Sequence, residues 1–241
     1  MLPKACTLSK MEKKDFISWV KKLEPTYLPN DSVAGQLASI DLIAIVGPTG
    51  VGKTTIIEKL GIPYVKSDVT RPSRDDEKDG HEYFFRSDYF KMLDEIKACE
   101  YAQFLTSHSG EFYGTRIGSY PADGPATMAV VASAIPTFRK LGFKRVIPIY
   151  ILPPGYIEWL RRIGTRRASD LDARMKEAAE SLPIALDDAE YHFVLNDDLD
   201  VAVEEVKTIL AGGKVSEHRE TLARSSADLL FGRLGVTDDL L

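Results

Sequence analysis

The sequence predicts an α/β protein with a mostly parallel sheet that is covered by helices on both faces. The first observation is a continuous apolar run from Leu42 to Val46, which is typical of a buried parallel strand. The second is that further apolar runs follow, at Met128 to Ala132, Val146 to Leu152 and His192 to Leu195. The third is that helical patterns lie between or after these runs, near 88–98, 155–163, 170–182 and 199–210. Strands that alternate with helices favour a parallel sheet with helices packed on each side.

Composition narrows the classes of protein to which the chain can belong. Its 241 residues suit one compact α/β domain with extensions, and its formal net charge of −5 argues against a nucleic-acid partner. The chain has no secretory signal and no apolar run of about 18 residues, so we expect no membrane partner and no membrane-spanning segment. Its cysteines, Cys6 and Cys99, form neither a disulfide framework nor a metal-ligand spacing, which predicts a cytoplasmic protein.

Residues 1–40 precede the first strong strand and predict an N-terminal extension with an amphipathic helix. Ser9 and Glu12 have capping-box spacing, and apolar residues follow at helical spacing, at Phe16, Trp19, Val20 and Leu23. We expect the helix to end before Pro25 and a loop to follow at 29–31. The apolar face of this helix either packs on the main domain or binds a partner.

A glycine-rich turn follows the first strand at once. Residues 47–54 read Gly-Pro-Thr-Gly-Val-Gly-Lys-Thr, which matches the pattern G-x-x-x-x-G-K-[ST]. Glycines let successive backbone N–H groups point at phosphate oxygens, and the helix expected at about Thr54 to Leu60 adds its positive N-terminal end. The motif and its flanks therefore predict a fold of the P-loop NTPase type that binds ATP or GTP.

The residues of this turn have expected roles. Lys53 would reach the β- and γ-phosphates and Thr54 would give its hydroxyl to Mg²⁺, so ATP and Mg²⁺ are the expected cofactors. The turn would also hold the nucleotide through Gly47, Thr49, Gly50, Val51, Gly52 and Thr55. GTPases, ATPases and small-molecule kinases share this cradle, so other parts of the chain must distinguish them.

Two further regions stand outside the alternation of strands and helices. Residues from about 63 to 120 are rich in Asp, Arg, Tyr and Gly, and they predict an inserted subdomain. After Gly212-Gly213 comes a tail, 214–241, whose leucines suggest a helix, although Ser226 and Gly232 weaken the apolar stripe. These leucines are Leu222, Leu229, Leu230 and Leu234. We expect this tail to be a docked or partly ordered appendage.

The insert carries the first sign of a known family. Ser67, Arg71, Arg74 and Tyr83 have the spacing with which guanylate kinases hold an acceptor phosphate, and from about residue 41 to 213 the chain resembles that family. Guanidinium forks and hydroxyls suit a phosphomonoester dianion. On residue type alone, the same stretch would also suit a solvated charged loop. The resemblance implies that the insert binds the acceptor.

A second block, Glu100-Tyr101-Ala102-Gln103-Phe104, is similar to the family's Glu-Trp-Ala segment, whose glutamate reads guanine. A carboxylate suits guanine because N1–H and the 2-amino group are adjacent donors, whereas adenine presents an acceptor and a donor there. A second alignment places Gln103 at the base instead. A further alternative is that Glu100 is an exposed glutamate at a helix end.

Two more blocks extend the resemblance. Residues 110–115 are close to the family's Gly-x-x-Tyr-Gly-[Ser/Thr], which implies that Tyr113 binds the acceptor phosphate and Thr115 the base. About four extra residues, 105–108, precede this block. Residues 191–200 resemble the family's last strand, Asn-Asp-Asp turn and C-terminal helix, which implies that Asn196 contacts the adenine of ATP. The Asn/Asp cluster would also suit a helix N-cap.

Residues 153–182 resemble the family's helical lid. Phosphoryl transfer needs positive charge around the transferring group, and this segment would supply it from Arg161, Arg162, Arg166, Arg167 and Arg174. Arg174 falls where the family has a lid arginine, whereas Ile163 stands where another is usual. A surface role for these arginines is the alternative.

The chain departs from the family at residues 126–136. Guanylate kinases usually carry two aspartates here, near the acceptor and the metal, whereas this stretch reads Ala-Thr-Met-Ala-Val-Val-Ala-Ser-Ala-Ile-Pro. Mg²⁺ keeps several waters and binds substrate phosphates, so activity need not vanish without them. Without these carboxylates, the affinity for the acceptor, the selectivity for its base and the reaction rate can differ from those of the family.

The resemblance implies ATP-dependent phosphorylation of a nucleoside monophosphate, GMP or dGMP, by a monomer or homodimer. It implies catalytic roles for Lys53, Arg74, Arg162 and Arg174 in a domain that spans 41–213. Two alternatives stay open. One is a kinase for another phosphorylated acceptor, such as a different nucleotide or a ribose bisphosphate. The other is a non-catalytic binding module that resembles the family.

Overall fold

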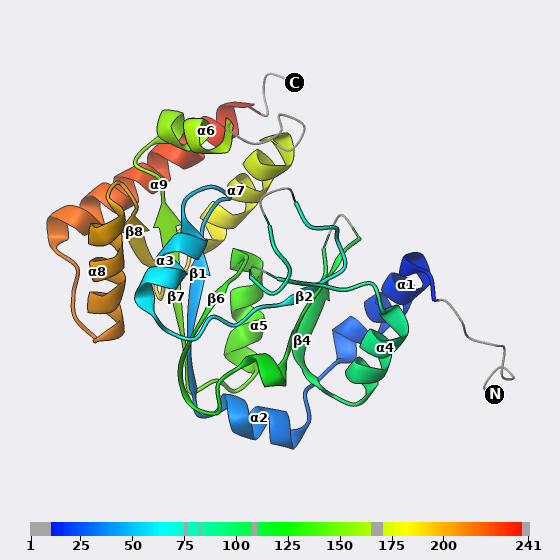
Figure 1. The fold of residues 1–241 in the computed structure, drawn as a ribbon. Coiled ribbons are helices and arrows are strands. Elements are labelled where there is room, and N and C mark those ends of the chain that lie inside the picture. Colours follow the sequence, from blue (N-terminus) through cyan, green and yellow to red (C-terminus); the bar gives the residue numbers. More distant parts are fainter. Residues whose placement is uncertain (1–10, 75–76, 82, 108–109, 165–170, 238–241) are drawn as a thin grey trace, which may run out of the picture. The chain divides into compact units, whose positions relative to one another are not determined.

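The structure is a computed structural model that describes residues 11–74, 77–81, 83–107, 110–164 and 171–237. Its chain divides into two compact units, whose elements are labelled in Figure 1. The core unit comprises residues 41–64 and 125–241, and the insert unit comprises residues 1–40 and 65–124. The N-terminal extension therefore folds with the insert, and the C-terminal tail folds with the core.

The core unit is built on a four-stranded sheet with the strand order β6-β1-β7-β8. Its strands are β1 (Ile40–Val46), β6 (Gly124–Ala129), β7 (Arg145–Leu152) and β8 (His192–Leu195). β7 pairs in parallel with both β1 and β8, so the predicted α/β class with a mostly parallel sheet is confirmed. β1 and β7 are buried over most of their length, which explains why their sequences are continuous apolar runs.

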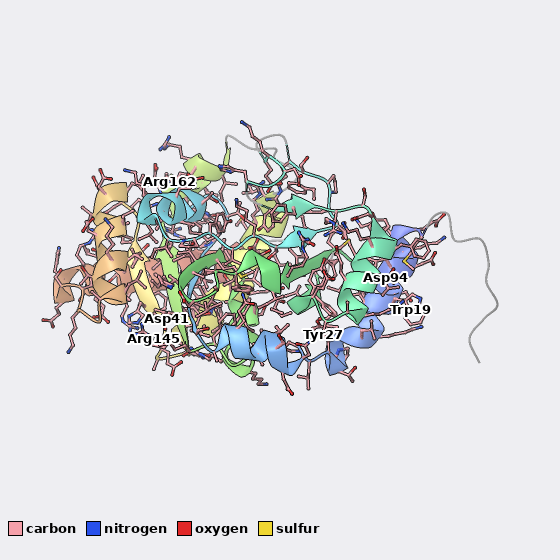
Figure 2. The ribbon with its side chains drawn as sticks, turned by 60° about the horizontal axis from the view of Figure 1, so that its bottom comes forward. Trp19, Tyr27, Asp41, Asp94, Arg145 and Arg162 are labelled. Carbon is pink, nitrogen blue, oxygen red and sulfur yellow. The ribbon has the colours of Figure 1, made fainter. Side chains whose placement is uncertain are left out.

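The register of β1 and β7 places opposite charges together at the start of these strands. Asp41 pairs with Arg145 along the ladder, and Nε and Nη2 of Arg145 donate to the carboxylate of Asp41 at 2.8 and 3.1 Å (Figure 2). Hydrogen bonding from this guanidinium lowers the pKa of Asp41. Ligands bind to α/β sheets at the carboxyl ends of the strands, so this ion pair marks the opposite edge.

Helices flank the sheet of the core unit (Figure 1). They are α3 (Lys53–Leu60), α5 (Ile135–Lys140), α6 (Tyr156–Gly164), α7 (Leu171–Leu186), α8 (Leu199–Leu210) and α9 (Glu217–Thr237). The predicted helices near 155–163, 170–182 and 199–210 are confirmed, although α7 continues beyond 182 and contains Pro183. None of the described helices combines the length and the apolar character that crossing a membrane requires.

The strand expected at Met128 to Ala132 is wrong at both ends. β6 begins at Gly124 and stops at Ala129, and Ala132–Ala134 form a 3₁₀ turn (η3) that leads into α5. Pro136 lies in the first turn of α5, where its missing N–H removes no intrahelical hydrogen bond. The apolar stretch from Met128 onward therefore contains the end of a strand, a turn and the start of a short helix, because all of these elements bury the same residue types.

The tail forms one continuous helix, α9, and its buried face includes two of the four predicted leucines, Leu230 and Leu234. Its buried face carries small residues at helical spacing, with Leu222 exposed and Leu229 70% exposed. Ser226, which we expected to weaken the apolar stripe, is buried and donates from its hydroxyl to the carbonyl oxygen of Pro153 at 2.7 Å. The apolar residues buried on this face are Ala223, Ala227, Leu230 and Leu234. Small side chains let the helix approach its neighbours closely, and a search for large apolar residues misses them.

The insert unit holds a second four-stranded sheet with the order β3-β2-β5-β4. Its strands are β2 (Asp68–Val69), β3 (Phe84–Phe85), β4 (Tyr101–Thr106) and β5 (Phe112–Arg116), and η2 (Ile117–Ser119) follows them. β5 runs antiparallel to both β2 and β4. We expected none of these strands, since β2 and β3 are two residues long and the region is rich in charge. The predicted helix at 88–98 is confirmed as α4 (Tyr89–Lys97).

The amphipathic helix of the N-terminal extension is confirmed as α1 (Lys13–Leu23), which ends before a 3₁₀ turn, η1 (Glu24–Thr26). Phe16 is fully buried, with its ring centroid 5.4 Å from those of Tyr89 and Phe112. Trp19, on the same helix, is 52% exposed (Figure 2). Ser9 lies outside the described residues, and Glu12 makes no side-chain capping hydrogen bond. The helix packs within the insert unit.

The loop expected at 29–31 is confirmed at Pro29 and Asn30, and a helix starts at Asp31. Asn30 is the N-cap of α2 (Asp31–Leu37), and its side chain accepts a hydrogen bond from the N–H of Val33 at 3.0 Å. Between α1 and α2, the hydroxyl of Tyr27 donates to the carbonyl oxygen of Tyr101 at 2.5 Å. This contact ties the extension to β4.

The chain leaves and re-enters each unit at neighbouring points. In the core unit, the N–H and the hydroxyl of Thr127 donate to the carbonyl oxygen of Pro63 at 2.8 and 3.1 Å, and Thr127 forms a β-bridge with Tyr64. In the insert unit, the N–H of Gly124 donates to the carbonyl oxygen of Ser39 at 3.1 Å. The segments that connect the units are therefore paired within each unit.

Candidate nucleotide and acceptor sites

The glycine-rich turn joins the end of β1 to the start of α3 in the core unit. Gly47 has a φ of +139°, and a Cβ there would lie 2.4 Å from the carbonyl oxygen of Ile151. Gly52 has a φ of +96°, and a Cβ there would lie 2.6 Å from Nδ2 of Asn196. Both positions therefore require glycine. The bare backbone of the turn suits a cradle whose N–H groups approach phosphate closely.

Lys53 opens α3 with its side chain folded back over the turn. Its Nζ donates to the carbonyl oxygens of Gly47 and Pro48 at 2.6 and 3.1 Å. The first N–H groups of a helix have no intrahelical acceptor and carry its positive dipole end. An anion at this position would meet both the lysine and these N–H groups. Thr54 is half-buried and Thr55 is exposed beside it.

The residues that support the turn come from the end of β8 and from α6. Nδ2 of Asn196 donates to the carbonyl oxygen of Val51 at 2.6 Å. Nη1 and Nη2 of Arg162 donate to the carbonyl oxygen of Asn196 at 3.1 and 3.2 Å. The indole N–H of Trp159 donates to the carbonyl oxygen of Thr49 at 2.9 Å. The structure thus brings Asn196 and Arg162 to the predicted cradle, and it adds Trp159, whose sequence pattern indicates only a buried helix face.

α6 also carries the carboxylate that orients Arg162. Glu158 accepts from Nε of Arg161 at 2.7 Å and from Nε of Arg162 at 2.9 Å. These hydrogen bonds lower the pKa of Glu158 to about 2, so the carboxylate stays ionised near neutral pH. Arg174 is buried on α7. Arg166 and Arg167, which we expected to contribute positive charge, lie outside the described residues.

The donor set around the turn bears on Mg²⁺. No group of three or more His, Cys, Asp or Glu side chains in the described part of the chain could hold a metal ion. Mg²⁺ needs few protein ligands where phosphates and waters complete its octahedral shell. The hydroxyl of Thr54, in the first turn of α3, fits that requirement.

In the insert unit, Arg71 is held in a fixed orientation. Its Nη1 and Nη2 donate to the two carboxylate oxygens of Glu77 at 2.6 and 2.7 Å. Its Cζ lies 5.1 Å from the ring centroid of Tyr83 and 5.4 Å from that of Phe85. Burial alone would lower the pKa of Arg71, but the carboxylate of Glu77 raises it above its ordinary value. The buried Nε makes no hydrogen bond with the described residues, so one edge of this guanidinium can take an anion.

Three other predicted acceptor residues lie around Arg71. The backbone N–H of Arg74 donates to Glu77 at 2.9 Å, and the Arg74 side chain is 42% exposed. The rings of Tyr83 and Tyr113 meet edge to face, with centroids 6.2 Å apart. Glu77 joins this group, although no role was predicted for it from the sequence. Burial alone would raise its pKa, but the hydrogen bonds from Arg71 and Arg74 and their charges together lower it below its ordinary value.

A second group of predicted residues is buried on β4, on β5 and just before β2. The hydroxyl oxygens of Ser67 and Thr115 lie 3.0 Å apart, and Nε2 of Gln103 donates to Thr115 Oγ1 at 3.1 Å. Gln103 stands opposite Thr115 in the β4–β5 register. Glu100, by contrast, is exposed just before β4. The structure thus brings Ser67, Thr115 and Gln103 together and leaves the Glu100 side chain apart from them.

An ionic network missed by sequence reasoning stabilises this sheet. The carboxylate of Asp68 is buried and accepts from Nη1 of Arg86 at 2.7 Å, from the hydroxyl of Tyr101 at 2.6 Å and from Nη2 of Arg116 at 3.2 Å. Burial raises the pKa of Asp68 despite these donors. Because Asp68 lies next to Ser67 in the chain, the network fixes the strand beside this predicted acceptor residue.

The comparison with protein families agrees with the P-loop and the arginine cluster. The family model described as guanylate kinase matches residues 39–212. The chain belongs to the guanylate kinase family. The match stops before α9, so that helix lies outside the part that the family describes.

Individual members of the guanylate kinase family match most of the chain. The guanylate kinase of Thermotoga maritima is 29% identical over 196 residues, which cover 76% of this chain and 93% of the relative. That of Bacillus cereus is 30% identical over 207 residues, which cover 79% and 96%. The crystal structure of guanylate kinase from Anaplasma phagocytophilum aligns with a TM-score of 0.53 at 21% identity, covering 76% of this chain and 90% of that one. The structural likeness supports the fold.

Proposed function

We propose that the protein transfers the γ-phosphate of ATP to GMP and so forms GDP and ADP. The observation that carries the proposal is the glycine turn with Lys53 folded over it, in a chain that belongs to the guanylate kinase family. The turn supplies the N–H groups and the cation that a triphosphate requires. The insert unit supplies Arg71 with an available Nε edge, which suits a monophosphate.

In this mechanism, Lys53 exchanges the carbonyl oxygens of Gly47 and Pro48 for the β- and γ-phosphates. The N–H groups of the turn hold the same phosphates, and Asn196 lies beside the adenine. Thr54 would hold Mg²⁺, which neutralises phosphate charge when bound. Arg162, which Glu158 and Asn196 orient, and Arg174 contribute positive charge as it redistributes during transfer.

The residues around Arg71 hold the second substrate. Arg71, Arg74, Tyr83 and Tyr113 bind the acceptor phosphate. One of its oxygens forms a bond to the γ-phosphorus while the bond from that phosphorus to the β–γ bridging oxygen breaks, and ADP leaves. The attacking oxygen is already anionic, so the step needs no general base.

The structure bears on which residue reads the base. Gln103 meets Ser67 and Thr115, whereas the sequence pattern favoured Glu100, whose side chain is exposed. We propose that Gln103 takes part in base recognition, since its carboxamide offers both a donor and an acceptor. Replacing Gln103 with alanine should raise the KM for GMP at least tenfold, the scale of a lost substrate hydrogen bond with an unpaired group left behind. Replacing Glu100 with glutamine should leave that KM within about twofold. The reverse ranking would return the role to Glu100.

A coupled assay of ADP formation with each of the four nucleoside monophosphates tests the main proposal. We expect GMP to be the preferred acceptor, and Lys53→Ala to lower kcat at least ~100-fold, as loss of a charge-stabilising donor does. Lys207→Ala is the control, because Lys207 is an exposed lysine of α8 paired with Glu204. No ATP consumption with any acceptor, despite measurable GMP binding, would instead indicate a binding module.

A kinase for a different phosphorylated acceptor is the second candidate. It is favoured by the absence of carboxylates from residues 126–136, where the family usually carries two. Turnover of another monophosphate or of a ribose bisphosphate, without turnover of GMP, would establish it. We further propose a cytoplasmic monomer or homodimer, consistent with the free thiol of Cys99 and testable by light scattering.

A further inference from the structure

Helix α9 makes polar contacts with the nucleotide side of the core unit, although it lies beyond the residues that match the family. Its position beside β8 brings Arg219, in its first turn, to the carboxyl end of that strand. About two turns further on, Ser226 donates to the carbonyl oxygen of Pro153, which follows β7. α9 therefore contacts the edge of the sheet at which ligands bind in α/β folds.

All three guanidinium nitrogens of Arg219 donate hydrogen bonds to the turn between β8 and α8 or to α8 itself. Nη2 donates to the carbonyl oxygen of Leu195 and to Oδ1 of Asp197, both at 2.9 Å. Nη1 donates to Oδ2 of Asp197 at 2.8 Å, and Nε donates to Oε1 of Glu205 at 2.5 Å. The side chain is 18% exposed, so these charge-assisted bonds are shielded from solvent more than a surface ion pair is.

The residue between these two contacts is Asn196. It lies between Leu195 and Asp197, and its side chain donates to Val51 within the glycine-rich turn. Its carbonyl oxygen accepts from Arg162. Asn196 thus lies between the residues that Arg219 binds and the glycine-rich turn. Among the described residues, Arg219 makes no hydrogen bond with the glycine-rich turn itself.

The local charge explains why this segment needs a cation. Asp197, Asp198, Asp200, Glu204 and Glu205 follow one another closely around the start of α8. Like charges at this spacing repel, and Asp197 has no lysine or arginine partner other than Arg219 in the described part of the chain. Consistent with this, the hydrogen bond from Arg219 lowers the pKa of Asp197.

We propose that Arg219 is a positioning residue for the nucleotide site. By fixing Leu195 and Asp197, it holds Asn196 where its side-chain amide supports the glycine-rich turn and lies next to the expected place of the adenine. The inference rests on the proposed function, because it assigns ATP to this turn. It gives the C-terminal helix a role in nucleotide affinity rather than in stability alone.

The test compares three variants of α9 in the full-length protein. Arg219→Ala removes the grip on the turn, and we expect it to raise both the Kd and the KM for ATP about five- to tenfold, the scale of indirect coupling between neighbouring sites. The KM for GMP should stay within about twofold. Arg219→Lys, which keeps a cation near Asp197, should recover part of the ATP affinity. Arg233→Ala is the control, because Arg233 is an exposed arginine of the same helix.

The variant Ser226→Ala distinguishes a role of Arg219 in ATP binding from a role in stability alone. This change removes the hydrogen bond to Pro153 and loosens α9 without touching the Asn196 segment. We expect Ser226→Ala to lower the Tm and to leave the Kd for ATP unchanged. Arg219→Ala should change the Kd even when each variant is measured at a temperature equally far below its own Tm. Equal Kd values for wild type and Arg219→Ala, or equal effects of Arg219→Ala and Ser226→Ala, would overturn the inference.

Titration with ATP and Mg²⁺ keeps this result separate from the fate of the proposed function. ATP binding without GMP turnover would refute the proposed reaction, yet the Arg219 comparison would still be decided by the Kd values. GMP turnover with an unchanged Kd in Arg219→Ala would leave the reaction intact and remove the role of Arg219. Failure of the wild-type protein to bind ATP would overturn both.

Discussion

Replacing Gly52 with alanine measures how closely the nucleotide turn is fitted to its support. Gly52 has a φ of +96°, and an added Cβ would lie 2.6 Å from Nδ2 of Asn196. A left-handed conformation costs an alanine about 1–2 kcal/mol. Displacing the Asn196 amide from Val51 removes a hydrogen bond worth about 1 kcal/mol. The sum is about 2–3 kcal/mol, which should lower the Tm of the core unit by roughly 4–12 °C.

Gly61 offers a matched control at the other end of the same helix. Its φ is +67°, and an added Cβ would meet no heavy atom within 4 Å. Gly61→Ala should therefore carry the conformational cost of about 1–2 kcal/mol alone. Thermal unfolding followed by circular dichroism compares the stabilities, and initial rates at varied ATP compare the sites. We expect Gly52→Ala to lower kcat/KM for ATP roughly 10- to 100-fold, because the phosphate-binding N–H groups shift, and Gly61→Ala to leave it unchanged. Equal losses in the two variants would refute the reasoning, since they would show that the contact with Asn196 contributes nothing.

The remaining predictions concern the insert unit. Glu77→Gln should raise the KM for the acceptor several-fold and change the KM for ATP less, because Arg71 loses the carboxylate that fixes its orientation; steady-state kinetics at varied GMP checks this, and an unchanged KM would contradict it. The pKa of Glu77 lies below its ordinary value of 4.5 in the folded protein, so its contribution to stability is complete above pH 4.5 and is lost as the pH falls through the lowered pKa. The difference in Tm between wild type and Glu77→Gln should therefore shrink on acidification, and a difference that grew instead would reverse the assigned sign. Phe16→Ala should destabilise the insert unit by about 3–5 kcal/mol in urea titrations, because its ring is fully buried against Tyr89 and Phe112. Trp19→Ala, at an exposed position of the same helix, should cost no more than about 0.5 kcal/mol, and similar losses in the two would argue against the packing described.

The core unit was largely predictable because its signals are local. The range predicted for the last strand matches β8, and that predicted for the helix after it matches α8. Asp198 explains the sharp start of α8, since its side chain accepts from the N–H groups of Asp200 and Val201. Likewise, the glycine-rich turn follows β1 and leads directly into α3. Each of these features depends on a short run of consecutive residues.

The acceptor side was less predictable because it depends on strand register. Gln103 meets Thr115 only because β4 and β5 pair as they do, with an irregularity between Tyr101 and Gln103. A register shift of one residue would turn Gln103 to the other face of the sheet. Sequence alone could not choose between Glu100 and Gln103, since the length of the hairpin does not state which strand absorbs the extra residues.

The contribution of the tail was hidden for a different reason. Ala223 and Ala227 carry little hydrophobicity, yet they are buried, whereas the bulkier Leu222 and Leu229 are exposed. The polar anchors, Arg219 and Ser226, act on backbone carbonyl groups far away in the sequence. Such contacts leave no periodic pattern, so only the folded chain reveals that the helix is docked.

The paired connections between the units have an evolutionary consequence. Because Thr127 is hydrogen-bonded to Pro63, residues 65–124 leave and rejoin the core at adjacent positions, and a short turn could close the gap at little entropic cost. The insert unit can therefore diverge largely through one stretch of gene, residues 65–124, while the core sheet is inherited intact. Residues 1–40 would have to be exchanged along with that stretch, because Phe16 and Tyr27 complete its interior and its hairpin.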